Sequence, residues 1–452
     1  MLVAEYFFQV VWSTAKQGST ATLGRIRLGK AAIVGMLLLL SAPVAAITGS
    51  NYIGILVGER PMGMGGAYAA VADDPSGLYY NPAGIVYGHA PNLSASVNAY
   101  HITSTRYQDA LGAGSDWERQ SQEFLPNFFG TTQPLGPLTV GFSYATPLAV
   151  REQQSQTFGA GVVQRDEVQS FSVNVDNSDT INEIGPSVAL EVNDRLAVGA
   201  TVYAHQREQQ TIMTQVLDLK GKKDGSDVDD YELQTLYANN EQLGVSWMLG
   251  AVFAASERIS LGASVRSTEI LSATNSRKGV CRGSELEDYE NEAGEKSSCI
   301  NSTQEIVPGK LVFVDKIETH IRDSYPLEMR LGVAFFASQR LLLAADVIHY
   351  TAVGYRRSVT NYALGGEYYL SPDWALRAGF YTDYSNTYPG ATHHVDRYGG
   401  SLSISRFSRN SSVSVGVIGA RGVGKAHIID ADETQDLVTS SFTAFLATSY
   451  SY

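Results

Sequence analysis

Long hydrophobic runs are missing from most of this chain. After residue 46 no stretch approaches the roughly 18 apolar residues that a membrane-spanning helix needs, so further helical spans are not expected. Charged residues are also sparse, at 17%, and their balance is acidic, with a formal net charge of −13. Since no basic patch is available to neutralise phosphates, the composition argues against a nucleic-acid partner.

Catalytic signatures are missing as well. The chain has no G-x-S-x-G, no H-E-x-x-H and no phosphate-binding loop, so an enzyme is not expected and no cofactor is implied. Two acidic stretches, Asp224–Glu232 and Ser284–Glu295, lack the spaced ligands and fixed glycine of a calcium loop. They are typical of solvated surface loops, with cation binding as the alternative. The adjacent His393 and His394 would point in opposite directions in a strand, so no metal site is predicted.

The N-terminal part of the chain has the pattern of an export signal. A basic segment, Arg25–Lys30, precedes the apolar run Ala31–Leu40 and the small-residue stretch "SAPVAA", which predicts cleavage after Ala46. The apolar run is short for a spanning helix, so an uncleaved anchor is the less favoured alternative. No cysteine stands at the cleavage site, so a lipid anchor is not expected. Residues 1–46 are therefore interpreted as a signal peptide with an upstream extension.

Cysteine is scarce, and both cysteines lie in one polar segment. Cys281 and Cys299 fall within Asn275–Pro308, the longest polar connection of the chain. Export places them in an oxidising compartment, which favours a disulfide between them over two free thiols.

From about Asn92 onward the chain repeats a period-two pattern. Stretches such as "LTVGFSY", "LAVGATV" and "ISLGASV" place apolar residues on one face and glycine, serine, alanine or threonine on the other, which is the signal of a β-strand. Short turns such as "NDR", "SER" and "SPD" alternate with longer polar connections, among them Arg151–Thr180 and Leu217–Glu232. Counting through the pattern gives about fourteen strands.

Two all-β architectures use strands of this kind. A soluble sandwich would bury the apolar faces against each other, whereas a transmembrane barrel would turn them toward lipid. The alternation of short and long connections, strands of ten or so residues and the aromatic ending "FTAFLATSYSY" favour the barrel. Residues 91–452 are predicted to form a transmembrane antiparallel β-barrel of about fourteen strands in a Gram-negative type of cell outer membrane.

Residues 47–90 come before the first strand, and turn formers crowd them. A fourteen-strand barrel has a lumen too wide for its own side chains to fill, so a compact N-terminal segment is expected to plug it. Within it, "ADDPSGLYYNPAGI" is predicted to be the tip and return of the plug. Asp73 and Asp74 are expected to reach inward-facing arginines such as Arg266 or Arg330. A flexible periplasmic leader is the alternative.

Two stretches carry a resemblance to a known family. "GMGGAYAAVADDPSGLYYNPAG" is similar to the hatch segment of the FadL family of outer-membrane transporters for long-chain fatty acids and other hydrophobic compounds, TodX-like proteins included. The hatch motif falls on Asn81, Pro82 and Ala83. "LGGEYYLSPDWALRAGFYTDYS" and "DRYGGSLSISR" resemble late strands of the family. The resemblance implies a fourteen-stranded barrel, an N-terminal plug and lateral passage of an apolar substrate from the wall into the bilayer.

Three functions are compatible with such a barrel. The leading hypothesis is passive transport by a monomer, with a hydrophobic small molecule such as a fatty acid or hydrocarbon and outer-membrane lipid as its partners. The alternative is a PorV-like barrel that docks proteins or acts as a surface scaffold. A general porin is a third, and the hatch-like segment argues against it.

Charged residues on the otherwise small and polar face are the candidate site residues. Centring the "SPD" turn near Pro372 sets Glu367 opposite Arg377, so we predict an ion pair inside the barrel. Arg330 and Arg377 are also candidates for binding a substrate carboxylate, for which the guanidinium geometry is suited. The structural alternative is that these charges only hold the plug.

Overall fold

The computed structural model describes residues 51–88, 91–109, 116–160, 167–286, 309–388, 393–426 and 435–451. The predicted signal peptide, Cys299 and most of the acidic stretch Ser284–Glu295 lie outside these residues.

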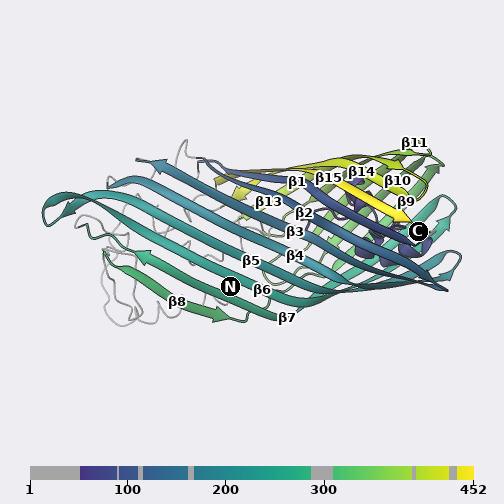
Figure 1. Cartoon of the computed structure of the whole chain (residues 1–452), viewed down its shortest axis with the longest axis horizontal. Coiled ribbons are helices and arrows are strands. Elements are labelled where there is room, and N and C mark those ends of the chain that lie inside the picture. The colour runs from purple at the N-terminus through teal and green to yellow at the C-terminus, as the bar shows by residue number, and fades with distance from the viewer. Residues whose placement is uncertain are drawn as a thin grey trace, which may run out of the picture.

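The described chain is dominated by antiparallel strands that close into a barrel (Figure 1). The strands are β1 Asn92–Tyr107, β2 Trp117–Leu135, β3 Leu138–Gly159, β4 Val168–Asn193, β5 Leu196–Lys223, β6 Ser226–Ser256, β7 Ile259–Arg282, β8 Leu311–Thr319, β9 Glu328–Ser338, β10 Leu341–Tyr350, β11 Val359–Ser371, β12 Trp374–Asp383, β13 His393–Phe407, β14 Ser411–Ala426 and β15 Gln435–Ser451. Strands that follow each other in the sequence pair with each other, except that β8 and β9 each pair with β7 instead of with one another. The barrel is closed by the pairing of β1 with β15. The wall thus has fourteen strands, with β8 as an additional piece, and the predicted fold is confirmed.

The strands on one side of the barrel are far longer than the sequence pattern of short and long connections predicts. β4, β5 and β6 have 26, 28 and 31 residues. The prediction of polar connections at Arg151–Thr180 and Leu217–Glu232 was therefore largely wrong, because both stretches are mostly strand. β5 and β6 are joined by a tight turn at Asp224 and Gly225, which have φ of 51° and 73°. These extensions project at the end of the barrel opposite the C-terminus (Figure 1).

The two faces of the wall differ as the alternation predicts. Large apolar side chains such as Phe142, Val198 and Leu249 are exposed on the outside. Alanine, glycine and hydroxyl residues with a few charges face inward, and Ala145, Ser143 and Ala197 are buried. An apolar outer band around a polar lumen is the arrangement that lipid requires of a closed barrel.

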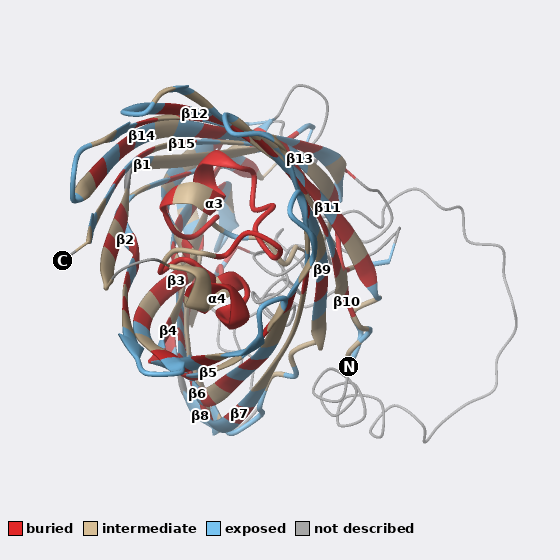
Figure 2. Cartoon of the chain, turned by 90° about the vertical axis from the view of Figure 1, so that its right-hand side faces the viewer, coloured by how far each residue is buried: buried red, intermediate tan, exposed pale blue. Residues whose placement is uncertain are grey.

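Residues 51–88, here called the hatch, lie inside the lumen (Figure 2). They contain α3 Glu59–Gly63, α4 Gly77–Tyr80 and the 3-10 helix η2 Pro82–Tyr87. No helix in the described part of the chain has the length and apolar character to cross a membrane.

Candidate transport pathway

The hatch packs against a set of glycines on the inner face of the wall, here called the glycine floor. At each of these positions an added Cβ would stand 3.2 Å or less from a hatch atom: Gly130, Gly141, Gly199, Gly250, Gly262, Gly332, Gly365 and Gly379. Gly199 and Gly250 face each other across a strand pair, as do Gly262 and Gly332, and Gly365 and Gly379. The glycines in the middle of the repeated strand pattern thus let the hatch backbone approach the wall directly.

The Asn-Pro-Ala motif holds the hatch turn to this floor. Asn81 is fully buried, and its Nδ2 donates to the carbonyls of Ala69, at 2.7 Å, and Ala251, at 3.0 Å. Its Oδ1 accepts from the backbone N–H of Ala83 at 3.2 Å, while Pro82 occupies the first turn of η2, where a missing N–H costs nothing. One side chain therefore fixes the turn, a second hatch segment and the β6 wall.

Replacing Asn81 with Ala is expected to loosen the hatch and leave the barrel folded. The Ala83 N–H and the carbonyls of Ala69 and Ala251 each lose a hydrogen bond, at a cost of about 1–3 kcal/mol for each buried group left unsatisfied. Hydrogen exchange of the backbone amides of residues 69–83 measures this and should accelerate by at least about tenfold, since about 1.4 kcal/mol is one factor of ten. The matched control is Asn174→Ala, an exposed position on β4. Unchanged exchange in the hatch would show that the motif is not its anchor.

A buried charge cluster ties α3 to the wall of β11 to β14. The Arg377 Nε donates to the Glu367 Oε1 at 2.7 Å, across the strand pair in which the two residues stand opposite each other, and both side chains are buried. Arg60 of the hatch donates to the other oxygen of Glu367, also at 2.7 Å. Glu59 accepts from Ser412 at 3.1 Å and lies 3.7 Å from Arg377. Glu367 thus links two arginines, one from the wall and one from the hatch.

A second anchor stands on β9 and β10. Asp346 accepts from the backbone N–H groups of Tyr68 and Ala69, at 2.9 and 3.0 Å. Arg330 donates to Asp346 at 3.3 Å and to the Gly66 carbonyl at 3.0 Å. Both Arg330 and Arg377, the candidates for substrate binding, are therefore paired with carboxylates at the hatch. This pairing favours the structural alternative for both.

The expected partners of Asp73 and Asp74 were wrong. Asp73 forms its ion pair with Arg60, within the hatch, and Asp74 accepts from the N–H of Ser76 at 2.7 Å. Arg266 instead donates to the Tyr79 carbonyl at 2.5 Å and lies 3.4 Å from Glu183. Both aspartates therefore have their partners within the hatch: Arg60 for Asp73 and the Ser76 N–H for Asp74.

Two apolar clusters line the barrel. The hatch cluster consists of Leu56, Val57, Met62, Met64, Ala67, Tyr68, Ala70, Val71, Ala72, Tyr80, Phe128, Ala145, Ala334, Leu342, Ala344, Ile348, Tyr350, Ala363, Tyr381, Ile418 and Phe445. The mouth cluster lies mostly toward the strand ends opposite the short turns and consists of Tyr107, Trp117, Phe158, Val168, Phe171, Val173, Val175, Leu219, Leu286, Val395, Ala426 and Leu437. They adjoin at Asn51, which donates to the carbonyl of Val395 at 3.0 Å while Tyr52 and Ile53 pack on the hatch cluster.

The wall opens between β2 and β3 beside the hatch cluster. Ser121 pairs with Glu152 and Phe128 with Ala145, but residues 122–127 have no partner among residues 146–151. The interval from Ser121 to Phe128 equals the interval from Ala145 to Glu152, so the two strands separate without an inserted residue in either. In that register Pro126 would face Pro147, and neither has an N–H to donate. The prolines thus keep this part of the ladder from forming.

The hatch supplies a hydrogen-bond donor to one backbone carbonyl in this gap. The N–H of Ile55 donates to the carbonyl of Pro147 at 2.9 Å, and a Cβ on Gly54 would stand 2.6 Å from the same oxygen. Asn127 donates to the Leu56 carbonyl at 3.0 Å, and its neighbour Phe128 belongs to the hatch cluster. On the outer side, Phe124 is 73% exposed. The gap therefore joins an apolar interior to the lipid-facing surface. Prolines inside strand patterns were the sequence signal for it.

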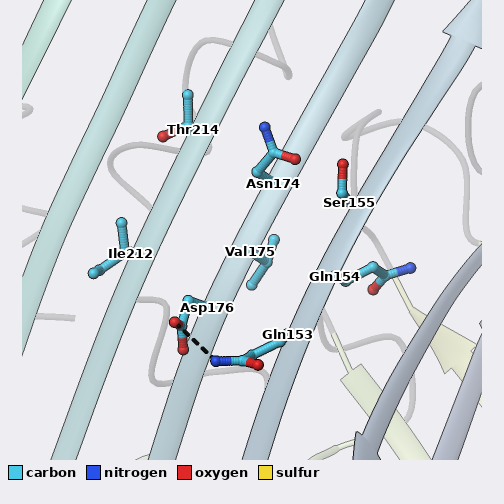
Figure 3. A pocket seen from close by; sticks show the side chains of 8 residues that line it. All are labelled: Gln153, Gln154, Ser155, Asn174, Val175, Asp176, Ile212 and Thr214. Atoms are coloured by element: carbon cyan, nitrogen blue, oxygen red, sulfur yellow. Dashed lines mark hydrogen bonds between the residues drawn. The ribbon is translucent and has the colours of Figure 1, made fainter.

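A cavity of about 400 Å³ lies on the extended strands β3 to β5, and none of the residues that line it belongs to the hatch (Figure 3). Gln153, Asn174 and Asp176 line it and are exposed, and Gln153 donates to Asp176 at 3.3 Å. No group of potential metal ligands occurs among the described residues.

Cys281 lies on the outer part of β7, opposite Val312 of β8. Its predicted partner, Cys299, is not among the described residues, so the disulfide stays a prediction. Thiol labelling of the unfolded protein should give no adduct before reduction and two afterwards. Equal labelling in both conditions would contradict the prediction.

A plugged barrel with an apolar interior that opens through its wall is the architecture of an outer-membrane transporter of hydrophobic compounds. Residues 56–286 match the family model described as outer membrane protein transport protein (OMPP1/FadL/TodX). The chain belongs to this family, whose members are transport proteins and not enzymes. No curated protein matches the chain.

Several solved structures share the fold of this chain. A Pseudomonas aeruginosa FadL homologue is 16% identical, with a TM-score of 0.57, over 89% of this chain and 100% of its own. The Pseudomonas putida toluene transporter TodX is 15% identical, with a TM-score of 0.57, over 88% and 99%. The Ralstonia pickettii toluene transporter TbuX is 15% identical, with a TM-score of 0.54, over 88% and 99%.

Proposed function

We propose that this protein carries uncharged hydrophobic molecules, monoaromatic or aliphatic hydrocarbons, passively from the cell surface into the outer membrane. The observation that carries the proposal is the gap between β2 and β3, where the hatch cluster meets the lipid-facing surface. An apolar molecule in the lumen gains by staying in contact with apolar groups, at about 25 cal/mol per Å² kept from water. The gap offers such a molecule a way out that avoids the aqueous side.

The substrate class follows from the charges that line the hatch. A fatty acid carboxylate needs a cation that is not already neutralised. Arg330 and Arg377, the two arginines predicted for that role, are held by Asp346 and by Glu367. A hydrocarbon needs no such partner. Toluene transporters are among the structural relatives, which is consistent with this class.

Closing the gap tests the route. Leu125 and Leu148 would stand opposite each other if β2 and β3 kept their register. With the native cysteines replaced by serine, Leu125→Cys with Leu148→Cys is expected to form a disulfide across the gap. In liposomes, uptake of toluene should fall at least about tenfold after oxidation and recover after reduction.

The control is a disulfide in the intact part of the same ladder. Thr131 and Phe142 are already paired, so Thr131→Cys with Phe142→Cys should leave uptake unchanged in both redox states. Full uptake with the gap covalently closed would contradict lateral exit. Preferential uptake of a long-chain fatty acid over toluene by the wild type would contradict the proposed substrate class.

A further inference from the structure

The outward side chains of the long strands change in character partway along β5. Val198 and Val202 are exposed and belong to the apolar outer band. The outward residues that follow include Gln206, Glu208 and Gln210, all exposed. Since charged residues on the lipid face are costly near the midplane of a bilayer, the hydrocarbon ends close to Gln206. The rest of β5 stands outside the membrane, on the cell-surface side opposite the short turns.

Above this level β3 to β6 present one continuous outer surface, here called the amide face. The strands keep their register across it, since Gln153 pairs with Asp176, Asp176 with Ile212, and Ile212 with Tyr237. Because side chains alternate along a strand, every second residue belongs to this surface. It consists of Arg151, Gln153, Ser155, Asn174, Asp176, Ser178, Gln210, Ile212, Thr214, Thr235, Tyr237 and Asn239.

Neutral amides and hydroxyls dominate the amide face. Its charged members are Arg151 and Asp176, and it contains no lysine and no glutamate, although these side chains are usually found on solvated surfaces. Charges return at the tip of the β5–β6 hairpin, where Lys220 stands opposite Asp229. The uncharged composition is therefore confined to this face and is not a property of the whole extension.

Part of the hydrogen-bonding capacity of the amide face is unused. Gln153 donates to Asp176 at 3.3 Å. The side chains of Ser155, Asn174 and Gln210 are exposed and have no hydrogen-bond partner among the residues that the structure describes. A side-chain amide offers two donors and one acceptor oxygen, and a hydroxyl offers both functions. A ligand whose groups also both donate and accept is the natural complement of such a surface.

The centre of the amide face is hollowed by the cavity of about 400 Å³. Figure 3 shows Ser155, Asn174 and Thr214 beside one another on three neighbouring strands. Ile212 also lines the cavity and lies next to Asp176 across the β4–β5 pair. The cavity thus combines polar side chains with an apolar one. A sugar ring has the matching pattern, because hydroxyl groups surround its edge and C–H groups cover its faces.

Three other kinds of ligand fit the amide face less well. Hydrophobic cargo follows the lumen, and Phe171 and Val175, which alternate with outward residues such as Asn174, belong to the mouth cluster on the opposite side of the wall. A metal ion needs several oxygen ligands with charge, and Asp176 is the single carboxylate of the face. A polyanion needs several cations, and Arg151 is the single one. A neutral saccharide needs neither.

The amide face also lies at the height of sugars and not of lipid phosphates. Gln210 and Thr214 are four and eight residues beyond Gln206. For strands tilted by about 45° this places the face roughly 10–20 Å above the hydrocarbon. The polar head groups of a bilayer reach only about 5–8 Å beyond the hydrocarbon on each side. A glycolipid in the outer leaflet carries its sugars past this layer and beside the wall.

We infer that the amide face binds the neutral sugars of a glycolipid in the outer leaflet. The acyl chains lie beside the apolar band below Gln206, and the sugars lie along β3 to β5, where Gln153, Ser155 and Gln210 hydrogen-bond to their hydroxyls. The continuous ladder holds these side chains on a rigid surface, so little order is lost on binding. The inference goes beyond transport, because it gives the outer wall a partner that is independent of the cargo.

Native mass spectrometry of the whole protein in detergent tests the inference with two glycolipids. Lipopolysaccharide with a complete core oligosaccharide is compared with lipid A, which keeps the acyl chains and phosphates but lacks the core sugars. The fraction of protein that carries each lipid, measured at rising lipid concentration, gives the two affinities. One neutral hydrogen bond changes an affinity by roughly two- to tenfold, so the complete glycolipid should bind at least about tenfold more tightly. Equal affinities would overturn the inference.

A triple variant locates the binding surface. Gln153→Ala with Ser155→Ala and Gln210→Ala removes three polar side chains from the amide face and touches no group of the hatch. The affinity for the complete glycolipid should fall to that for lipid A, while the affinity for lipid A itself stays unchanged. A variant that keeps the full preference for the complete glycolipid would contradict the assignment to this face.

The matched control removes two glutamines and one serine near the short turns, with Gln133→Ala, Gln339→Ala and Ser408→Ala. It should bind both glycolipids as the wild type does. The shift of the folded barrel on heating in gel electrophoresis verifies that both variants fold, and toluene uptake should be unchanged in both, so failure of this inference leaves the proposed function standing.

Two further outcomes would assign the amide face to a different occupant. Tighter binding of the released core oligosaccharide than of the intact glycolipid would show that the face serves a soluble saccharide and not a lipid of the leaflet. Dimers of the wild type that the triple variant does not form, measured by analytical ultracentrifugation, would show that the face joins two copies of this chain. Either result would overturn the inference.

Discussion

Gly379→Ala is expected to displace the hatch and make the barrel leak ions. A Cβ at Gly379 would stand 2.1 Å from the Gly65 nitrogen and 2.2 Å from the Met64 carbonyl carbon. Both are backbone atoms of the hatch, and Gly65 has a φ of 63°, which few other residues adopt without strain. The methyl group has no flexible neighbour to push aside, so the hatch must move, at a cost of about 1–3 kcal/mol. Single-channel recording in planar bilayers should show a several-fold higher conductance.

Gly400→Ala is the matched control for this substitution. Gly400 lies on β13, opposite Phe380, and an added Cβ there would have its nearest atom at 3.6 Å, which is an ordinary contact. Its conductance should equal that of the wild type. If both variants conduct alike, the close approach of hatch and wall does not block the lumen.

Glu367→Ala is expected to cause the largest loss of stability. Arg60 and Arg377 each hydrogen-bond a different oxygen of this carboxylate at 2.7 Å, and the side chains of Glu367 and Arg377 are buried. Removing the acid leaves Arg377 without its main counter-charge and Arg60 with Asp73 alone, and breaking a buried pair in this way costs about 3–5 kcal/mol. Urea unfolding in lipid vesicles, followed by tryptophan fluorescence, measures the change.

The comparison variant is Glu318→Ala, which removes an exposed carboxylate paired with Lys316 at 2.6 Å. An exposed pair in water contributes little to stability, so the midpoint should barely move. A shift of similar size in the two variants would mean that the buried cluster does not hold the hatch to the wall.

The sequence predicts the wall well because one periodic signal governs it. The lipid-facing alternation and the short turns determine the strand count, and the "SPD" turn places Glu367 opposite Arg377. The outer ends of the long strands were not predicted, because polar residues occupy both faces there and the period-two alternation of apolar and polar residues is lost. The Asp224–Gly225 pair was the available signal, since Asp-Gly is favoured in tight hairpin turns.

The pathway was less predictable because it depends on departures from the periodic pattern. Pro126 and Pro147 mark the gap between β2 and β3, yet a proline in an edge strand or bulge looks the same in sequence. The partners of Asp73 depended on which arginine the folded hatch brings near, and Arg60 lies only a few residues away. Contacts between the hatch and the glycine floor join segments far apart in the chain, and no local pattern encodes them.

The long strands of β4 to β6 also carry one side of the wall beyond the length that spans the bilayer. Spanning the bilayer takes roughly ten tilted residues, whereas β6 has 31. About twenty residues at about 3.3 Å each, tilted by about 45°, raise the rim roughly 45 Å above the hydrocarbon. The wall is therefore asymmetric: β9 to β12, with 10 to 13 residues each, span little more than the bilayer, whereas β4 to β6 reach far outside it.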